Sequence, residues 1–235
     1  MRILLTWEHN GDDSLLYVQN YPGAYARGRN LQEALDKIPA EVHSYCRWAG
    51  LPWEADYEVE VTEEKISRLR ISDADSDVIF EAEKEPLTHE EYERLKELAL
   101  HSARTFEALY QAIPDKHRSA LKERETFYGK VPRTAAEMYS HTRQVNSYYF
   151  GEIQVEADNE GSLEECRRRG FENLEKQADF LKNRVFEWED ETWSLRKVLR
   201  RFIWHDRIHA RAMWRMACKT FEGFKTDTFG FEEKA

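Results

Sequence analysis

The chain has 235 residues, which is enough for one large domain or two small ones with a real hydrophobic core. Its formal net charge of −10 argues against the basic surfaces with which proteins bind nucleic acids or membrane headgroups. No stretch approaches the roughly 18 apolar residues of a membrane span, and the first residues are too briefly apolar for a signal peptide. Three widely spaced cysteines, Cys46, Cys166 and Cys218, indicate free thiols. We therefore expect a cytoplasmic protein without nucleic-acid or membrane partners.

The first 64 residues carry strand patterns around one helix pattern. The predicted strands are 2–8, 14–19, 24–28 and 58–63. The last of these alternates strictly between polar and apolar residues, which is typical of a half-buried strand. Residues 30–48 follow helical spacing after Asn30, a possible N-cap, and Pro39 falls inside the pattern, where a proline kinks a helix. The order predicts a small β-β-β-α-β domain over 1–64.

A segment of this domain resembles a known family. Residues 21–38 read YPGAYARGRNLQEALDKI. This segment resembles the signature of HicB-type antitoxins, which lies between the third strand and the helix of their fold. The resemblance covers about 1–64 and implies a HicB-like domain. It departs from the family in that no helix-turn-helix or ribbon segment for DNA binding follows it.

Beyond a mixed, acidic connector over 65–87, the hydrophobic period changes from 2 to 3.6. Three N-terminal capping boxes precede helical runs. They pair Thr88 with Glu91, Thr134 with Glu137, and Ser162 with Glu165. The predicted helices are 89–113, 135–153, 163–187 and 193–220, with Thr192 as the N-cap of the last. We predict an α+β protein whose second part, 88–235, is an up-down four-helix bundle. The long 114–132 connection is a candidate functional loop that could lie over one end of the bundle.

Three histidines lie on the apolar stripes of two predicted helices. His205 and His209 are one turn apart on the last helix, and His141 lies on the stripe of the second. Two histidines at i and i+4 place their rings on one helix face, within reach of a single ion. A third from a facing helix completes a triangular site, and imidazole suits zinc, nickel, copper and iron. The alternative is that each is a core histidine with its own hydrogen-bond partners.

The residues around these histidines resemble a second family. Residues 133–145 read RTAAEMYSHTRQV, and residues 193–213 read WSLRKVLRRFIWHDRIHARAM. Both segments resemble the DinB-like superfamily of metal-binding four-helix bundles, and the match covers about 77–220. The resemblance implies that His141, His205 and His209 bind one divalent ion, most readily zinc or nickel, with open coordination positions. Asp206 stands where glutamate is common in the family. Such bundles often pair, so the resemblance also implies a homodimer.

Two acidic residues adjoin the predicted ligands. Glu137, one turn before His141, is a candidate fourth ligand or hydrogen-bond acceptor for a ligand ring, with the helix cap as its alternative role. Asp206 could orient a ligand ring or be an ordinary surface charge.

Other side chains are weaker candidates. Tyr148 and Trp204 could line a substrate space or belong to the core, and His101 is not expected to be a ligand. Arg201, Arg207 and Arg211 could bind an anionic substrate or answer the dipole of their helix. Cys218 lies too far along the helix to join the site.

Three classes of function follow. The first is a metal-dependent enzyme, because the wider DinB-like superfamily includes transferases and isomerases that use a low-molecular-weight thiol to attack a small electrophile. The second is a non-catalytic module in which the metal stabilises the fold and the HicB-like domain makes contacts, since the sequence offers no convincing acid, base or nucleophile beside the ligands. The third is antitoxin-like action of the first domain.

Overall fold

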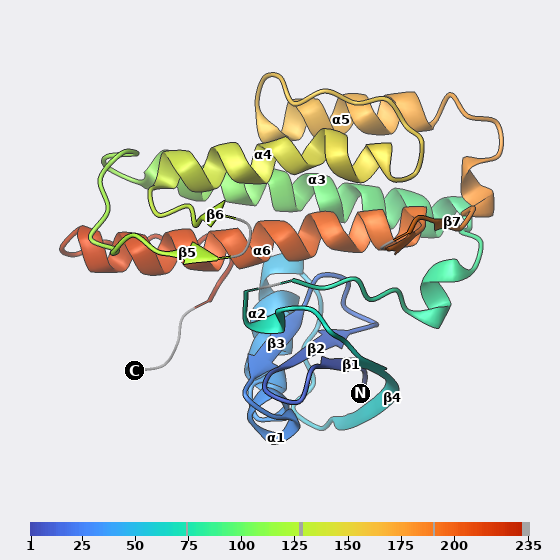
Figure 1. Ribbon diagram of the computed structural model, residues 1–235, viewed down its shortest axis with the longest axis horizontal. Coiled ribbons are helices and arrows are strands. Elements are labelled where there is room, and N and C mark those ends of the chain that lie inside the picture. The colour runs from blue at the N-terminus through green and yellow to red at the C-terminus, as the bar shows by residue number, and fades with distance from the viewer. Residues whose placement is uncertain (74, 127–128, 190, 232–235) are drawn as a thin grey trace.

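A computed structural model describes residues 1–73, 75–126, 129–189 and 191–231. It is a mixed α+β structure with a four-stranded sheet in its N-terminal part and helices in its C-terminal part, as predicted. The sheet and its helices lie against one side of the helical part, where the longest helix runs between the two (Figure 1).

The sheet has the strand order β3-β2-β1-β4. Its strands are β1 (Arg2–His9), β2 (Ser14–Val18), β3 (Tyr25–Gly28) and β4 (Glu58–Ile66), which confirms the four predicted strands. The first three pair antiparallel, whereas β4 returns parallel to β1. The prediction that β4 is half-buried is wrong, because it is an edge strand with most of its side chains in solvent.

The predicted helix 30–48 is two helices. α1 (Leu31–Leu35) begins after Asn30, whose side chain accepts a hydrogen bond from the backbone N–H of Glu33, as an N-cap does. α2 (Ile38–Ala49) begins immediately afterwards, with Pro39 in its first turn. A backbone N–H in the first turn of a helix has no helical carbonyl to donate to, so a proline there loses no helical hydrogen bond. Instead of a kink at Pro39, the helix is interrupted before it, between Leu35 and Ile38.

The connector packs against both parts. It contains two short 3-10 turns, η1 (Ile71–Asp73) and η2 (Glu81–Lys84). Val78 and Phe80 are buried in one cluster with Tyr17 of the sheet and Trp204 of the last helix.

The C-terminal part contains the four predicted helices with altered ends. They are α3 (His89–Ala112), α4 (Ala135–Gly151), α5 (Leu163–Leu174) and α6 (Leu195–Thr220). All three predicted capping boxes are present. The predicted N-cap Thr192 is wrong: Ser194 caps α6, because β8 (Thr192–Trp193) pairs with β7 (Phe186–Glu187).

Helix α5 is half as long as predicted, because tertiary contacts replace its expected second half. After Leu174 the chain forms a single 3-10 turn, η3 (Phe180–Lys182), and reverses at Asn183, which has a φ of +53°. The amide of Asn183 donates to the carbonyls of Glu83 and Glu85. These contacts hold a left-handed residue that a continuing helix cannot contain.

The bundle does not alternate in direction as predicted, because α4 and α5 run parallel. The Tyr139 hydroxyl accepts a hydrogen bond from the Leu163 N–H near the start of both helices, and Phe150 packs on Phe171 near their ends. The connection between them runs back along α4, where the carbonyl of Gly161 accepts from Arg143. Helix α6 is antiparallel to both.

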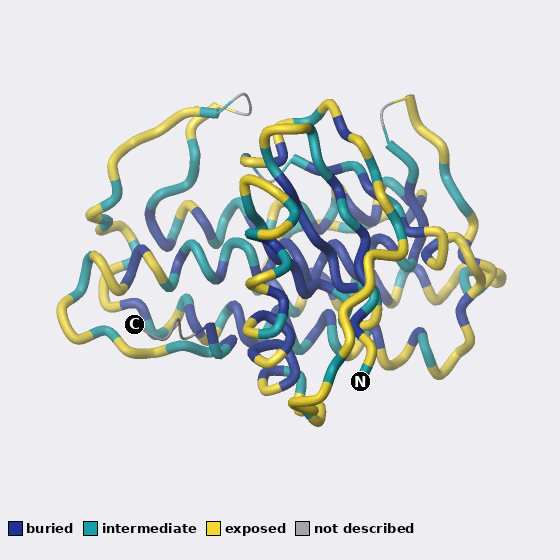
Figure 2. The backbone as a smooth tube through the Cα atoms, turned by 90° about the horizontal axis from the view of Figure 1, so that it is seen from below, coloured by how far each residue is buried: buried dark blue, intermediate teal, exposed yellow. Residues whose placement is uncertain are grey.

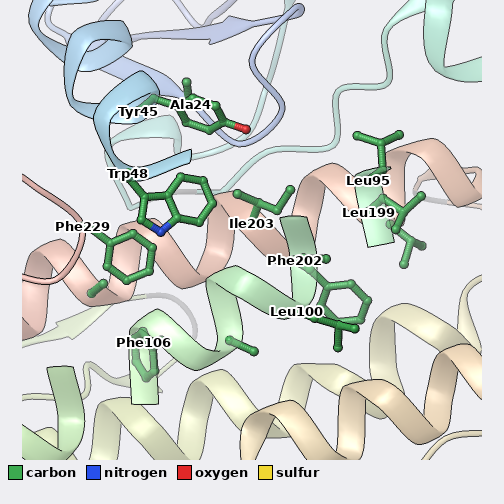
Figure 3. Packing of buried hydrophobic residues seen from close by; sticks show 14 of the residues in the cluster. Ala24, Tyr45, Trp48, Leu95, Leu100, Phe106, Leu199, Phe202, Ile203 and Phe229 are labelled. Carbon is green, nitrogen blue, oxygen red and sulfur yellow. The ribbon is translucent and has the colours of Figure 1, made fainter. Parts of the chain in front are cut away.

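Helix α6 is buried from two sides. Figure 3 shows Phe202 on the side of the bundle with Leu100, and Ile203 on the side of α2 with Tyr45 and Trp48. One continuous hydrophobic cluster includes all five side chains. In Figure 2 many of the residues coloured as buried gather in the middle of the molecule, where the N-terminal part lies over the helices. The sequence predicted one apolar stripe on α6, and this stripe is the side that faces the bundle. The second buried side, which faces the N-terminal part, was not predicted.

The long connection lies at the end of the bundle, as predicted. It contains a short antiparallel pair of strands, β5 (Glu125–Thr126) and β6 (Gly129–Lys130). The backbone N–H of Ala120 donates to the hydroxyl of Thr220 at the C-terminus of α6, at 2.9 Å. Across the described residues, none of the helices combines the length and apolar composition that a bilayer span requires.

Replacing Gly23 by alanine is expected to weaken the contact between the sheet and α6. Gly23 has a φ of +91°, and an added Cβ would lie 2.7 Å from Ile203 Cβ and 2.9 Å from the Trp204 backbone nitrogen. Gly11, with a φ of +94° and open space around it, is the matched control. We expect Gly11→Ala to cost roughly 1–2 kcal/mol of unfolding free energy from backbone strain. Gly23→Ala should cost roughly 1–3 kcal/mol more from overpacking. Equal urea-unfolding midpoints would contradict the close contact.

Candidate metal centre

The structure brings the three predicted histidines together. His141 on α4 and His205 and His209 on α6 form a group whose candidate ligand atoms all lie within 4.8 Å of one another. The ring centroids of His205 and His209 are 4.4 Å apart, and that of His141 is 4.6 Å from His209 and 5.2 Å from His205. Within the described part of the chain, this is the group of histidine, cysteine or carboxylate residues that could hold a metal ion.

Local sequence sets this convergence. The capping box at Thr134 starts α4 two turns before His141, so the rotation of His141 about the helix axis is set from the first turn. The antiparallel packing of α4 on α6 is fixed further along by Tyr149, whose ring meets Phe202 edge-on at 5.3 Å. His205 and His209 then share the α6 face that α4 covers.

The three imidazoles differ in exposure. His205 is buried, with 7% of its surface exposed, whereas His141 and His209 lie at intermediate depth. Residues 142, 146 and 149 form the buried stripe of α4, one position further along than the predicted stripe, so His141 lies at the margin of the core. The site therefore has one ligand in the interior and two nearer solvent.

Burial keeps the histidines neutral. It lowers the pKa of His141, and lowers that of His209 to about 3, because a charged ring would lose its hydration. The pKa of His205 also lies well below its ordinary value because of burial, with smaller contributions from the other two rings and from Arg201 and Arg167. Neutral imidazole is the form that binds metals.

One imidazole nitrogen is left without a partner. The Nδ1 atom of His205 is buried and has no hydrogen-bond partner among the described residues. An unsatisfied polar atom in the interior is costly, and a coordinated ion is one way of satisfying a ring nitrogen. Three neutral imidazoles and one unsatisfied nitrogen fit a divalent transition metal such as zinc or nickel.

Glu137 lies at the helix cap. Its carboxylate accepts hydrogen bonds from the backbone N–H groups of Arg133 and Thr134, at 2.8 and 3.0 Å. These bonds hold the pKa of Glu137 below its usual value. The structure places Glu137 outside the three-histidine group, in the capping role that was the alternative to ligation.

Asp206 is not a surface charge. It is fully buried and forms a two-pronged ion pair with Arg167 of α5, with N–O distances of 2.6 and 3.0 Å. Arg167 also donates to the carbonyl of Ala99 on α3. Asp206 thus ties three helices together immediately beside His205, and its described hydrogen bonds go to Arg167 and not to a ligand ring.

Most of the other predicted neighbours have structural roles. Arg207 and Arg211 both bind Glu41 of α2, which joins α6 to the N-terminal part. Trp204 packs on Tyr17 of the sheet, away from the histidines. His101 stacks on a tryptophan of α2 and lies outside the group, as expected.

Two further side chains considered from the sequence are exposed. Cys218 lies near the end of α6, outside the histidine group. Tyr148 is half exposed, at 48%, so it does not belong to the core.

Sequence reasoning missed Tyr149 and Arg167. The Tyr149 ring lies edge-on to His205, with centroids 6.0 Å apart, and placing the α4 stripe one residue later would have identified it. Arg167 lies in an arginine run that gives no sequence signal of burial.

Comparison with known proteins gives no relative for this arrangement: no family model, no curated protein and no solved structure matches the chain.

Proposed function

We propose that the protein is a metal-dependent enzyme in which His141, His205 and His209 hold one divalent ion. The observation that carries the proposal is the convergence of three imidazoles from two helices, whose candidate ligand atoms lie within 4.8 Å of one another. The unpartnered Nδ1 of buried His205 supports it. Three protein ligands leave coordination positions free, which is the usual arrangement of a catalytic zinc and not of a structural one.

We further propose a DinB-like bundle that acts with a low-molecular-weight thiol on a small electrophile. A bound divalent ion would supply a strong local charge that deprotonates a coordinated thiol at neutral pH. The chain's part is to hold three neutral ligands in fixed positions and to open the site toward solvent beside His141 and His209. The sequence resemblance around the histidines supports this assignment, and zinc and nickel are the proposed metals.

A second candidate function is a metal-stabilised interaction module. Helix α6 carries two of the histidines on one face and the main contacts with the N-terminal sheet on another. A bound ion would then fix α4 to α6 and stabilise the surface that the HicB-like domain rests on. This function needs the metal but no open coordination position.

Ligand exchange on cobalt-substituted protein distinguishes the two functions. We expect the visible absorption bands of bound cobalt to shift when 2-mercaptoethanol or azide is added, because each occupies an open position. Cobalt that binds at one ion per chain and responds to neither ligand would overturn the enzyme and leave the module. Protein that takes up neither zinc nor nickel would contradict both. His101→Ala, which changes a histidine outside the group, is the matched control.

A further inference from the structure

The buried arginines of this protein fall into two kinds. Four arginines are at most 8% exposed: Arg167, Arg200, Arg201 and Arg207. Three of them have a carboxylate partner, namely Asp206, Glu83 and Glu41. Arg201 is the exception, because no described carboxylate lies within 4.0 Å of its guanidinium.

Besides its interaction with the Tyr149 hydroxyl, Arg201 has few polar partners. Its Nη1 donates to the backbone carbonyl of Ser76 at 3.0 Å, and its Nε is buried without a hydrogen-bond partner among the described residues. Its guanidinium carbon lies 4.6 Å from the ring centroid of Trp204, 5.6 Å from that of Trp193 and 5.7 Å from that of Tyr149. Aromatic faces attract a cation but do not neutralise it. The carboxylates of Glu191 and Glu8 act on Arg201 only from beyond ion-pair distance. A buried guanidinium without a carboxylate in direct contact departs from the ordinary rule for protein interiors, and such exceptions concentrate at functional sites.

The position of Arg201 connects it to the histidine group. It precedes His205 by four residues on α6, so the two side chains lie on neighbouring positions about 6 Å apart along the helix axis. Tyr149 of α4 contacts both: its ring centroid is 5.7 Å from the Arg201 guanidinium and 6.0 Å from the His205 ring centroid. Tyr148, which is half exposed, lies beside Tyr149 and Trp193 at the surface end of this cluster.

We propose that Arg201 binds the oxyanion group, a carboxylate or a phosphate, of a small molecule whose other end lies at the three histidines. A guanidinium offers parallel N–H donors that match either group, and burial strengthens the interaction. The other arginines near the histidines have carboxylate partners: Arg167 pairs with Asp206, and Arg207 and Arg211 pair with Glu41. Arg201 has no described carboxylate within 4.0 Å that would compete with a ligand. Because Arg201 and His205 are one helical turn apart, a short molecule is enough to reach both Arg201 and the three histidines. This proposal deepens the proposed function and rests on the same site.

The test compares anionic and neutral thiols on cobalt-loaded protein. Dissociation constants are measured from the cobalt absorption bands for mercaptoacetate, mercaptomethylphosphonate and 2-mercaptoethanol. We expect wild-type protein to bind at least one of the two anionic thiols more tightly than 2-mercaptoethanol. Comparing the carboxylate with the phosphonate then shows which oxyanion group Arg201 binds. In Arg201→Met, which keeps the stacking and removes the charge, that preference should fall by about tenfold or more, the range for one charge-assisted hydrogen bond. Binding of 2-mercaptoethanol should change less than twofold.

Two further variants make the result specific. Arg168→Gln removes a charge from an exposed residue of α5 that pairs with Glu164, and should leave the preference unchanged. Arg201→Lys keeps the charge without the paired donors, and should retain only part of the preference. If Arg201→Met does not fold, Arg201→Lys is the variant that tests the proposal.

The outcomes separate this proposal from the metal site. A wild type without preference for either anion, or a preference unchanged in the Arg201 variants, overturns the role of Arg201 and leaves the metal site standing. Cobalt that responds to no thiol overturns the open metal site. In that case tryptophan fluorescence tests anion binding at Arg201 independently of the metal, since the rings of Trp193 and Trp204 lie within 6 Å of its guanidinium. A response to mercaptoacetate or inorganic phosphate that disappears in Arg201→Met supports it, and no response overturns it.

Discussion

Replacing His141 or His209 by alanine is expected to abolish tight metal binding. Wild-type protein should bind one zinc or nickel ion per chain, and each variant close to none after dialysis. The reason is geometric: three imidazoles from two helices converge, and either change leaves two ligands that cannot complete a site of three protein donors. Loss of an outer-shell partner alone typically weakens metal affinity 10- to 100-fold, so loss of a ligand should have a larger effect.

The measurement is elemental analysis of untagged protein after loading with zinc and with nickel. His101→Ala is the control, because His101 is partly buried, lies on α3 and stacks on Trp48 outside the group. It should load like the wild type. Full stoichiometry in His141→Ala or in His209→Ala would show that the ion, if bound, is held elsewhere.

The fold was predictable wherever local chemistry decides it. Each capping box places a helix start, because the serine or threonine and the glutamate three residues later satisfy backbone N–H groups with no help from the rest of the chain. The turn chemistry around Gly11 likewise separates β1 from β2. These signals depend on neighbours in sequence, so they survive whatever the tertiary structure does.

Helix ends and directions were not predictable, because they depend on distant contacts. Asn183 ends the α5 region by donating to carbonyls about 100 positions earlier in the chain. The parallel course of α4 and α5 depends on a connection that folds back along α4, which no periodicity encodes. β4 alternates like a half-buried strand, yet its place at the sheet edge leaves both faces largely exposed.

The same distinction holds for the candidate site. Spacing alone placed His205 and His209 on one face and His141 opposite them, and the structure brings the three together. For the arginines of α6, the sequence left open an anionic substrate or the helix dipole, and neither interpretation anticipates burial against carboxylates. Arg200 and Arg207 are in fact buried against carboxylates of the connector and of α2. The role of these arginines becomes clear only when the connector and α2 are packed against α6.

Replacing Asp206 by alanine is expected to destabilise the protein strongly. Both members of the Asp206–Arg167 pair are fully buried, and removing the carboxylate leaves the Arg167 guanidinium in the interior without its partner. Breaking such a pair costs about 3–5 kcal/mol of unfolding free energy. For a chain of this length that corresponds to a fall in melting temperature on the order of 10 °C. Thermal unfolding of the metal-free protein measures it, and a change of a few tenths of a kcal/mol would contradict the buried pair.

A double variant separates the two roles that Asp206 could have beside His205. Replacing a buried ion pair by apolar residues of similar volume is often neutral or stabilising, so Arg167→Met with Asp206→Leu should recover most of the stability lost in Asp206→Ala. If Asp206 serves the site only by holding α5 against α6, the double variant should also bind zinc as tightly as the wild type. If it orients a ligand ring, stability returns while zinc affinity stays reduced. The hydrogen bonds of Asp206 to Arg167 favour the first result, because the carboxylate that could turn a histidine is already occupied.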